Sequence, residues 1–300
     1  MSDTPDNPLS ATDFFNRGFD HQQAGRLSEA IADYTEAIRL DPQHEQAYLN
    51  RARMYAFQKS FEGALQDVQA VLQFNPTSAE AYHDQGVIYD LKNDYMQAII
   101  SYSKAIQHNP QLVFAYSNRG LVYTDLGRYD RALPDFNQAI ALNPQFGDAY
   151  FNRGIVYINL QDYDRAIADF DQSIQLKPDD YDGYLNRGFC YMHKQDFAKA
   201  ILDFVHLIQM NPKNPEAYNN RGYCQLYLGD YQKALDDFNM AIQLAPRTAN
   251  FYDSRGEYYI HIGDFDRAIA DFDYALRLDP HLQAASDNRI IAMQMKLAGG

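Results

Sequence analysis

The chain has few cysteines, few basic residues and no long apolar run. Its 300 residues include two cysteines, Cys190 and Cys224, without a CxxC pair or a Cys/His cluster, which argues against a disulfide framework or a zinc site. Lys and Arg number 26 against 40 Asp and Glu, a net charge of −14 that disfavours nucleic acid and anionic membranes as partners. No apolar stretch approaches about 18 residues, so we expect no membrane insertion.

The sequence also lacks targeting and catalytic motifs. The first residues, MSDTPDNPLSAT, contain no basic segment followed by an apolar run, so they predict no signal peptide, and the sequence indicates a cytoplasmic protein. The eight histidines are scattered, and no GxGxxG or Walker sequence follows a strand-like segment. We therefore predict that the protein is not an enzyme and has no cofactor and no metal site.

What the chain does contain is a repeat of 34 residues that begins at Ala11 and has no insertion or deletion. The eight units are residues 11–44, 45–78, 79–112, 113–146, 147–180, 181–214, 215–248 and 249–282. Position 4 is aromatic, position 20 is Ala and position 32 is Pro in all eight units. Position 8 is Gly in seven units and position 11 is Tyr in six, which makes a chance match untenable.

The spacing within a unit predicts two helices, here named helix A and helix B. Positions 4, 8 and 11 share one helical face, and positions 20, 24 and 27 share another. Between them, Gly25, Gly127, Gly229 and Gly263 suit a left-handed turn after helix A, and the Pro at position 32 ends helix B. A single hairpin cannot bury its apolar face alone, so the units must stack.

These residues in this frame resemble the tetratricopeptide repeat. The resemblance implies an all-α fold, a right-handed α-solenoid superhelix of antiparallel helix hairpins whose helices A line the concave side. Residues 283–300 repeat the helix A pattern and resemble a terminal capping helix and tail, with Met293 and Leu297 expected over the last repeat. Residues 1–10 are expected to form a disordered tail.

An Arg at position 7 and an Asp at position 23 suggest a pair within each hairpin. The Arg residues are Arg17, Arg51, Arg119, Arg153, Arg187, Arg221 and Arg255, and the Asp residues are Asp33, Asp67, Asp135, Asp169, Asp203, Asp237 and Asp271. The third repeat lacks both, with Gln85 and Ser101, which favours a pair over an independent solvated face. We expect Arg153→Leu to leave the melting temperature unchanged or raised.

The remaining helix A positions are candidates for binding. An Asn ladder at position 6 could pair with the backbone of an extended peptide; its candidate members are Asn118, Asn152, Asn186 and Asn220. Repeats five to seven add apolar candidates, although some of them could pack against neighbouring helices instead: Phe151, Ile155, Ile158, Leu185, Phe189, Met192, Tyr223 and Leu226. Repeats three and four carry Glu80, Asp84, Asp90 and Asp125.

The sequence thus favours a non-enzymatic scaffold or adaptor for protein–protein interaction. It would bind in its concave groove a client protein or peptide segment that is apolar with basic flanks, and the C-terminal cap favours a monomer. The alternative is a regulatory or substrate-presenting domain for an enzyme on another chain or on a longer parent chain.

Overall fold

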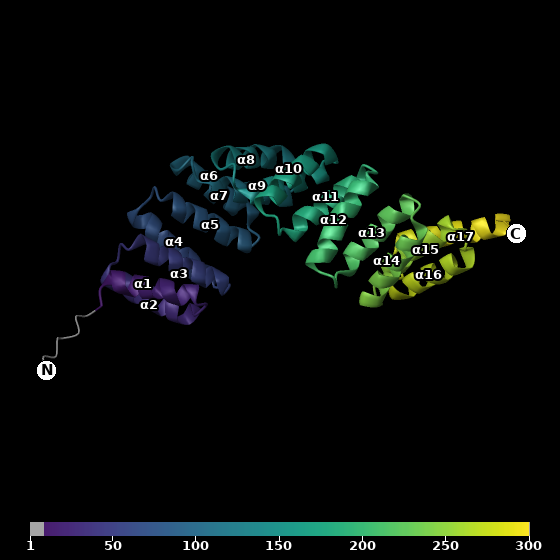
Figure 1. Cartoon of the computed structure of the whole chain (residues 1–300). Coiled ribbons are helices and arrows are strands. Elements are labelled where there is room, and N and C mark those ends of the chain that lie inside the picture. Colours follow the sequence, from purple (N-terminus) through teal and green to yellow (C-terminus); the bar gives the residue numbers. More distant parts are fainter. Residues whose placement is uncertain (1–8, 300) are drawn as a thin grey trace. The chain divides into compact units, whose positions relative to one another are not determined.

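The computed structural model describes residues 9–299, which form seventeen α-helices and no strand. Helices A are α1 (Ala11–Gln23), α3 (Glu45–Phe57), α5 (Ala79–Leu91), α7 (Val113–Asp125), α9 (Gly147–Asn159), α11 (Tyr181–His193), α13 (Pro215–Tyr227) and α15 (Ala249–His261). Helices B are α2 (Leu27–Leu40), α4 (Phe61–Phe74), α6 (Tyr95–His108), α8 (Tyr129–Leu142), α10 (Tyr163–Leu176), α12 (Phe197–Met210), α14 (Tyr231–Leu244) and α16 (Phe265–Leu278). The last helix is α17 (Gln283–Gly299). The predicted all-α solenoid of helix hairpins is confirmed (Figure 1).

The turn between helices A and B uses a left-handed residue in every repeat. Four of these residues are the predicted glycines Gly25, Gly127, Gly229 and Gly263. The other four are Lys59, Asn93, Gln161 and Gln195, with φ of 59–60°. These four were not predicted from the sequence. A polar residue can adopt the left-handed conformation at an energetic cost, so the absence of glycine does not exclude such a turn.

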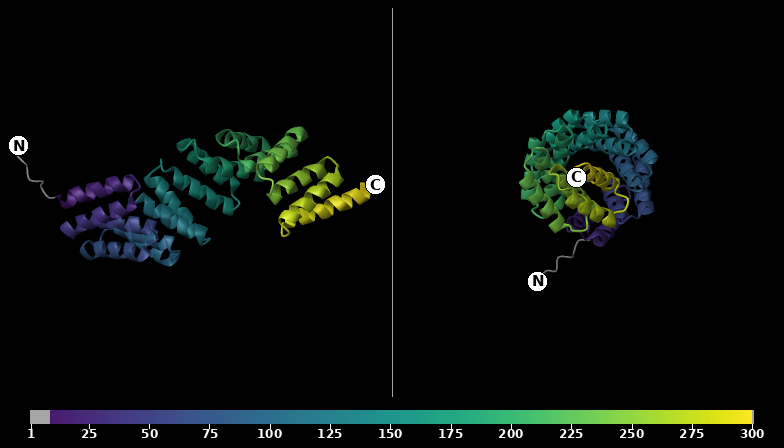
Figure 2. Two further views of the ribbon diagram at one scale, coloured as in Figure 1. Left: turned by 90° about the horizontal axis from the view of Figure 1, so that it is seen from below. Right: turned by 90° about the vertical axis from the view of Figure 1, so that its right-hand side faces the viewer.

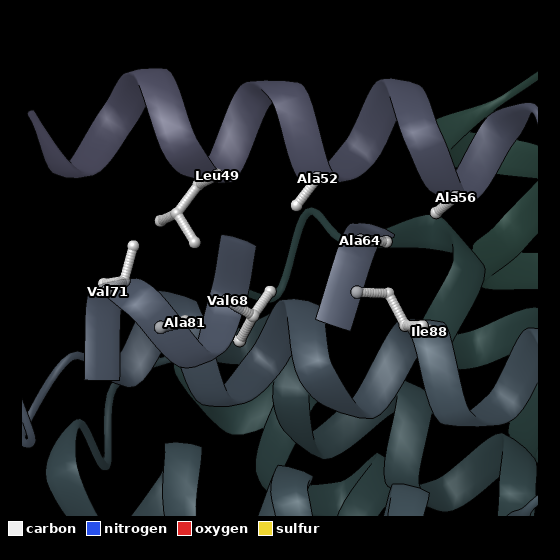
Figure 3. Close-up of a cluster of buried hydrophobic side chains, with 8 residues drawn as sticks. All are labelled: Leu49, Ala52, Ala56, Ala64, Val68, Val71, Ala81 and Ile88. Carbon is white, nitrogen blue, oxygen red and sulfur yellow. The ribbon is translucent and has the colours of Figure 1, made fainter. Parts of the chain in front are cut away.

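Close contact between helices A and B explains the Gly at position 8. A Cβ on Gly256 would lie 2.5 Å from Cε1 of Phe272, and the same conflict with the position-24 ring recurs along the chain. In the second repeat, Ala52 replaces Gly and faces Val68 in place of an aromatic ring (Figure 3). The two exceptions to the pattern are therefore coupled, since the smaller Val makes room for the extra methyl group.

The hairpins form two compact units, one ending at Ala149 and the other beginning at Tyr150. Within each unit, consecutive hairpins stack in sequence order (Figures 1 and 2). Helices A touch their neighbours in both units, as α3 touches α5 and α13 touches α15. Each unit is thus a layer of helices A packed on a layer of helices B, with the core between the layers.

Most of the predicted N-terminal tail is not described, and the C-terminal helix differs from its prediction in the exposure of two side chains. Residues 1–8 of the predicted tail lie outside the described residues, and Ser10 caps α1 by accepting a hydrogen bond from the Asp13 backbone. At the other end, α17 packs on α15 and α16, but Met293 and Leu297 are 42% and 84% exposed. The prediction that these two side chains cover the last repeat was wrong, because they lie on the face that a helix B would cover.

Candidate functional site

The predicted Arg–Asp pairs are present in all seven hairpins that contain both residues. In each pair the Arg Nε and Nη2 groups donate to the two Asp oxygens at 2.5–3.0 Å. All seven Asp side chains are buried. In the third repeat Ser101 donates to Gln85 at 3.0 Å, so a neutral hydrogen bond replaces the ion pair.

Each Arg also contacts other groups. The guanidinium of Arg187 lies 5.4 Å from the ring of Tyr184, and its Nη1 donates at 2.7 Å to Asp171 on the helix B of the preceding repeat. Arg255 contacts Tyr252 and Asn239 in the same way. Arg187 and Arg255 therefore join three helices and are occupied by protein partners, so their role is structural and not ligand binding.

The candidate Asn ladder is half-buried and partly hydrogen-bonded. Asn186 donates to the backbone oxygen of Asp182 at 2.8 Å. Asn118, in the first unit, lies 3.1 Å from Nε2 of His83. Asn152 and Asn220 are half-buried in the second unit. At least two of the four amides would therefore have to exchange an existing hydrogen bond before binding a peptide backbone.

The structure separates the apolar candidates by exposure. Phe189 on α11 is 42% exposed, whereas Leu226 on α13 is 2% exposed and lies in a core cluster with Phe238. The sequence interpretation of Leu226 as a binding residue is therefore corrected. Position 12 points inward in this repeat, whose position 11 holds Gln225 instead of Tyr.

The other apolar candidates are half-buried. Leu185 and Met192 pack against the core of the sixth repeat, and the ring of Phe151 meets that of Phe170 edge-on at 5.7 Å. Ile155 and Ile158 on α9 and Tyr223 on α13 also keep part of their surface exposed. Each of these residues can therefore offer only the exposed part of its side chain to a binding partner.

An aromatic surface lies at the C-terminal ends of helices α11, α13 and α15. We define it by Phe189, His193, Tyr223, Tyr227 and His261. The ring of Phe189 lies 4.3 Å from that of His193, and the ring of Tyr227 lies 4.7 Å from Tyr223 and 5.4 Å from His261. The sequence analysis missed three of these five residues because they occupy position 13, whereas the apolar candidates that it named occupy positions 5, 9 and 12.

Acidic side chains border the aromatic surface within the same unit. Glu257 on α15 accepts a hydrogen bond from the Tyr227 hydroxyl at 2.5 Å. One turn before it, Asp253 accepts from Asn288 at 3.2 Å, and burial raises the pKa of this carboxyl. The neighbourhood thus combines exposed rings with carboxylates.

The acidic candidates of the first unit divide into two groups. Glu80 and Asp84 lie 2.6 and 2.8 Å from the guanidinium of Arg53, so one positive charge offsets part of their two negative charges. Burial, and next the charge of Asp125, raise the pKa of Asp90. Asp90 and Asp125 thus repel each other, and a cation would relieve this repulsion.

The first unit also has a small apolar cavity between α3 and α5. Its volume is about 180 Å³, and its lining includes Phe57, Val87 and Leu91 together with the charged side chains of Arg53 and Asp84. Phe57 is 74% exposed at position 13, the position that also builds the aromatic surface of the second unit.

Metal-binding clusters, thiols and membrane-spanning helices can be assessed in the described part of the chain. Within residues 9–299 no group of three or more His, Cys, Asp or Glu side chains could hold a metal ion. Cys190 and Cys224 are buried free thiols, and burial raises the pKa of each to about 12. No helix over the same range has the length and apolar character needed to cross a bilayer.

Comparisons with known proteins agree with this architecture. Sequence models described as tetratricopeptide repeat match residues 15–79 and 117–181, 68–100, 153–219, 215–247 and 249–282. Together these matches extend over most of the chain.

Solved structures share the fold at low sequence identity. The assembly of Cut9 and Hcn1 from the APC/C matches with a TM-score of 0.58 and 21% identity, over 94% of this chain and 54% of that chain. Pseudomonas aeruginosa pilF matches with a TM-score of 0.57 and 18% identity, over 70% and 95%. YrrB, described as a TPR protein with an unusual peptide-binding site, matches with a TM-score of 0.54 and 22% identity, over 62% and 96%. At these identities the likeness establishes the fold alone.

Proposed function

Because the chain belongs to the tetratricopeptide repeat family, whose members are typically non-catalytic scaffolds for protein–protein interaction, we propose that it binds a client segment on its second unit. The proposed contact is the aromatic surface together with the exposed edges of Phe151, Ile155 and Ile158. The observation that carries the proposal is the grouping of exposed rings at the ends of three successive helices A. Such a surface suits a partner that covers the rings with apolar side chains.

The proposed client is an apolar segment with basic flanks. Asp253 and Glu257 border the aromatic surface on α15, where a Lys or Arg could approach them. The net charge of −14 favours the same choice at long range.

The Asn ladder has a secondary role in this proposal. Asn152 and Asn220, with Asn186 after loss of its internal bond, would donate to the backbone of an extended client. Both cysteines are buried thiols, which suits a reducing compartment, and we include a cytoplasmic monomer in the proposal.

A peptide array can test this function without knowing the client. We expect the purified chain to retain peptides that combine Phe, Leu or Ile with flanking Lys or Arg, and to discriminate against the same peptides with Glu flanks. Phe189→Ser should weaken a selected peptide by about tenfold, since it removes an exposed ring at the centre of the surface.

Leu202→Ser provides a matched control on the same repeat. Leu202 is 68% exposed, but it lies on helix B α12, so its replacement should leave peptide affinity unchanged. Equal affinity of the Phe189→Ser and parent proteins, or no preference for basic over acidic flanks, would refute the proposed surface.

A further inference from the structure

α17 buries one of its two apolar faces and leaves the other open. In the repeats, positions 3 and 10 of helix A face the preceding repeat, and positions 4, 8 and 11 face the helix B of the same repeat. On α17 the first set corresponds to Ala285 and Ala292, which are buried. The second set includes Ile290 and Met293, with Leu297 one turn further, and these side chains are 50%, 42% and 84% exposed. Within residues 9–299, α17 therefore has the packing of a helix A on which no helix B is packed.

Arg289 on α17 has fewer hydrogen-bond partners among the described residues than the corresponding Arg of the eighth repeat. In the eighth repeat, Arg255 donates from Nη1 to Asn239 of the preceding helix B and from Nε and Nη2 to Asp271 of its own helix B. Arg289 donates from Nε to Asp273 of the preceding helix B at 2.5 Å, and its Nη1 and Nη2 groups have no partner among residues 9–299. Its side chain is 35% exposed, compared with 20% for Arg255. A carboxylate from a further helix would complete this arrangement.

Ile290 sets a steric condition on that helix. Ile290 occupies position 8 of the helix A pattern. At the same position of the eighth repeat, a Cβ added to Gly256 would already lie 2.5 Å from the Phe272 ring. A helix that docks on α17 as helices B dock on helices A therefore needs a small residue after its acidic residue. The helices B of this chain carry Tyr, Phe or Val at that position, so the corresponding helix of a second copy does not fit.

We propose that the open face of α17, formed by Arg289, Ile290, Met293 and Leu297, docks an amphipathic helix of another protein. That helix presents an Asp or Glu to Arg289 and a Gly, Ala or Ser to Ile290, and covers Met293 and Leu297 with apolar side chains. The positive charge of Arg289 favours the Asp or Glu, and the branched side chain of Ile290 leaves room only for Gly, Ala or Ser. This site lies on a different face from the aromatic surface and does not depend on the proposed function.

A stapled peptide that copies Phe265–Leu278 with Phe272→Ala serves as the probe, since an isolated helix of this length is marginal in water. We expect fluorescence anisotropy to detect its binding to the full chain, and Arg289→Gln to weaken that binding at least tenfold through loss of the charged hydrogen bonds. The unsubstituted Phe272 peptide should bind the parent at least tenfold more weakly than the Ala peptide. Ile290→Gly should reverse that preference, because it restores the space that the ring occupies in the repeats.

Matched controls separate docking from non-specific adhesion. Met96→Ser removes an apolar side chain that is 60% exposed on α6, and it should leave peptide affinity unchanged. Ile290 is exposed, so circular dichroism of Ile290→Gly should match that of the parent. The proposal is overturned if the Ala peptide does not bind at concentrations on the order of 1 mM, or if both peptides bind the parent and Ile290→Gly equally.

Discussion

Replacing Arg221 by Leu tests whether the Arg–Asp pairs support the fold. Arg221 donates to both oxygens of Asp237 at 2.7 and 2.8 Å, and the preceding helix B offers Val205 instead of a polar partner. This pair is therefore the simplest in the chain. Its side chains are 21% and 8% exposed, so the carboxylate left by Arg221→Leu would be buried without a cation.

The expected loss of stability is about 3–5 kcal/mol, the usual cost of removing one partner of a buried ion pair. This value replaces the expectation that Arg153→Leu leaves the melting temperature unchanged or raised. The side chain of Asp169, the partner of Arg153, is only 6% exposed, and the same penalty applies there.

The third repeat supplies the matched control. There Gln85 and Ser101 occupy the two positions and form one neutral hydrogen bond. The double variant Arg221→Gln/Asp237→Ser should therefore stay within about 1 kcal/mol of the parent, because it buries no unpaired charge.

Urea unfolding followed by circular dichroism measures both variants. Hydrogen exchange at the amides of α13 and α14 locates the change, since repeat arrays can unfold in parts. If Arg221→Leu unfolds at the same urea concentration as the parent, or if the double variant is as unstable as the single one, the pairs do not stabilise the fold as argued.

Three further predictions follow from packing and burial. Gly256→Ala should cost about 1–3 kcal/mol through overpacking, and Phe272→Val should recover part of the loss in urea midpoints; simple addition of the two losses would contradict the coupling. Burial and a neighbouring carboxylate raise the folded-state pKa of Asp90, so its charge destabilises the fold at neutral pH; Asp90→Asn should raise the melting temperature at pH 7, and the gain should shrink as the pH falls through that raised pKa towards 3.8. Cys190 and Cys224, with pKa values raised to about 12, should react with a thiol reagent at pH 8 only after unfolding, and fast reaction of the native protein would contradict their burial.

The sequence predicted those features of the fold that recur in every repeat. The Arg–Asp pairs were predicted because the third repeat replaces both members together, and the helix periodicity because eight units share it. The coupling of Ala52 with Val68 follows the same logic, but it requires knowing that positions 8 and 24 touch. That contact lies between two helices, so periodicity along one helix does not reveal it.

The binding surface was harder to predict because it depends on partial exposure. Phe151 and Phe189 share a chemistry and both lie on helix A, yet the first packs on Phe170 and the second is open. Tyr227 and His193 were missed because a 13-residue helix ends at position 13, where the next turn leaves the side chain uncovered. Exposure at a helix end depends on the neighbouring hairpin, and a single repeat does not contain that information.

The pairing of seven Arg residues with seven Asp residues also sharpens the charge argument for the client. Each pair is neutral as a whole, so setting the pairs aside leaves 19 basic and 33 acidic side chains with the net charge of −14 unchanged. The same pairing removes seven of the 26 basic residues from the set that could attract an acidic partner. The surface that a client meets is therefore more acidic in proportion than the composition indicates, which favours basic flanks on the client at the encounter stage.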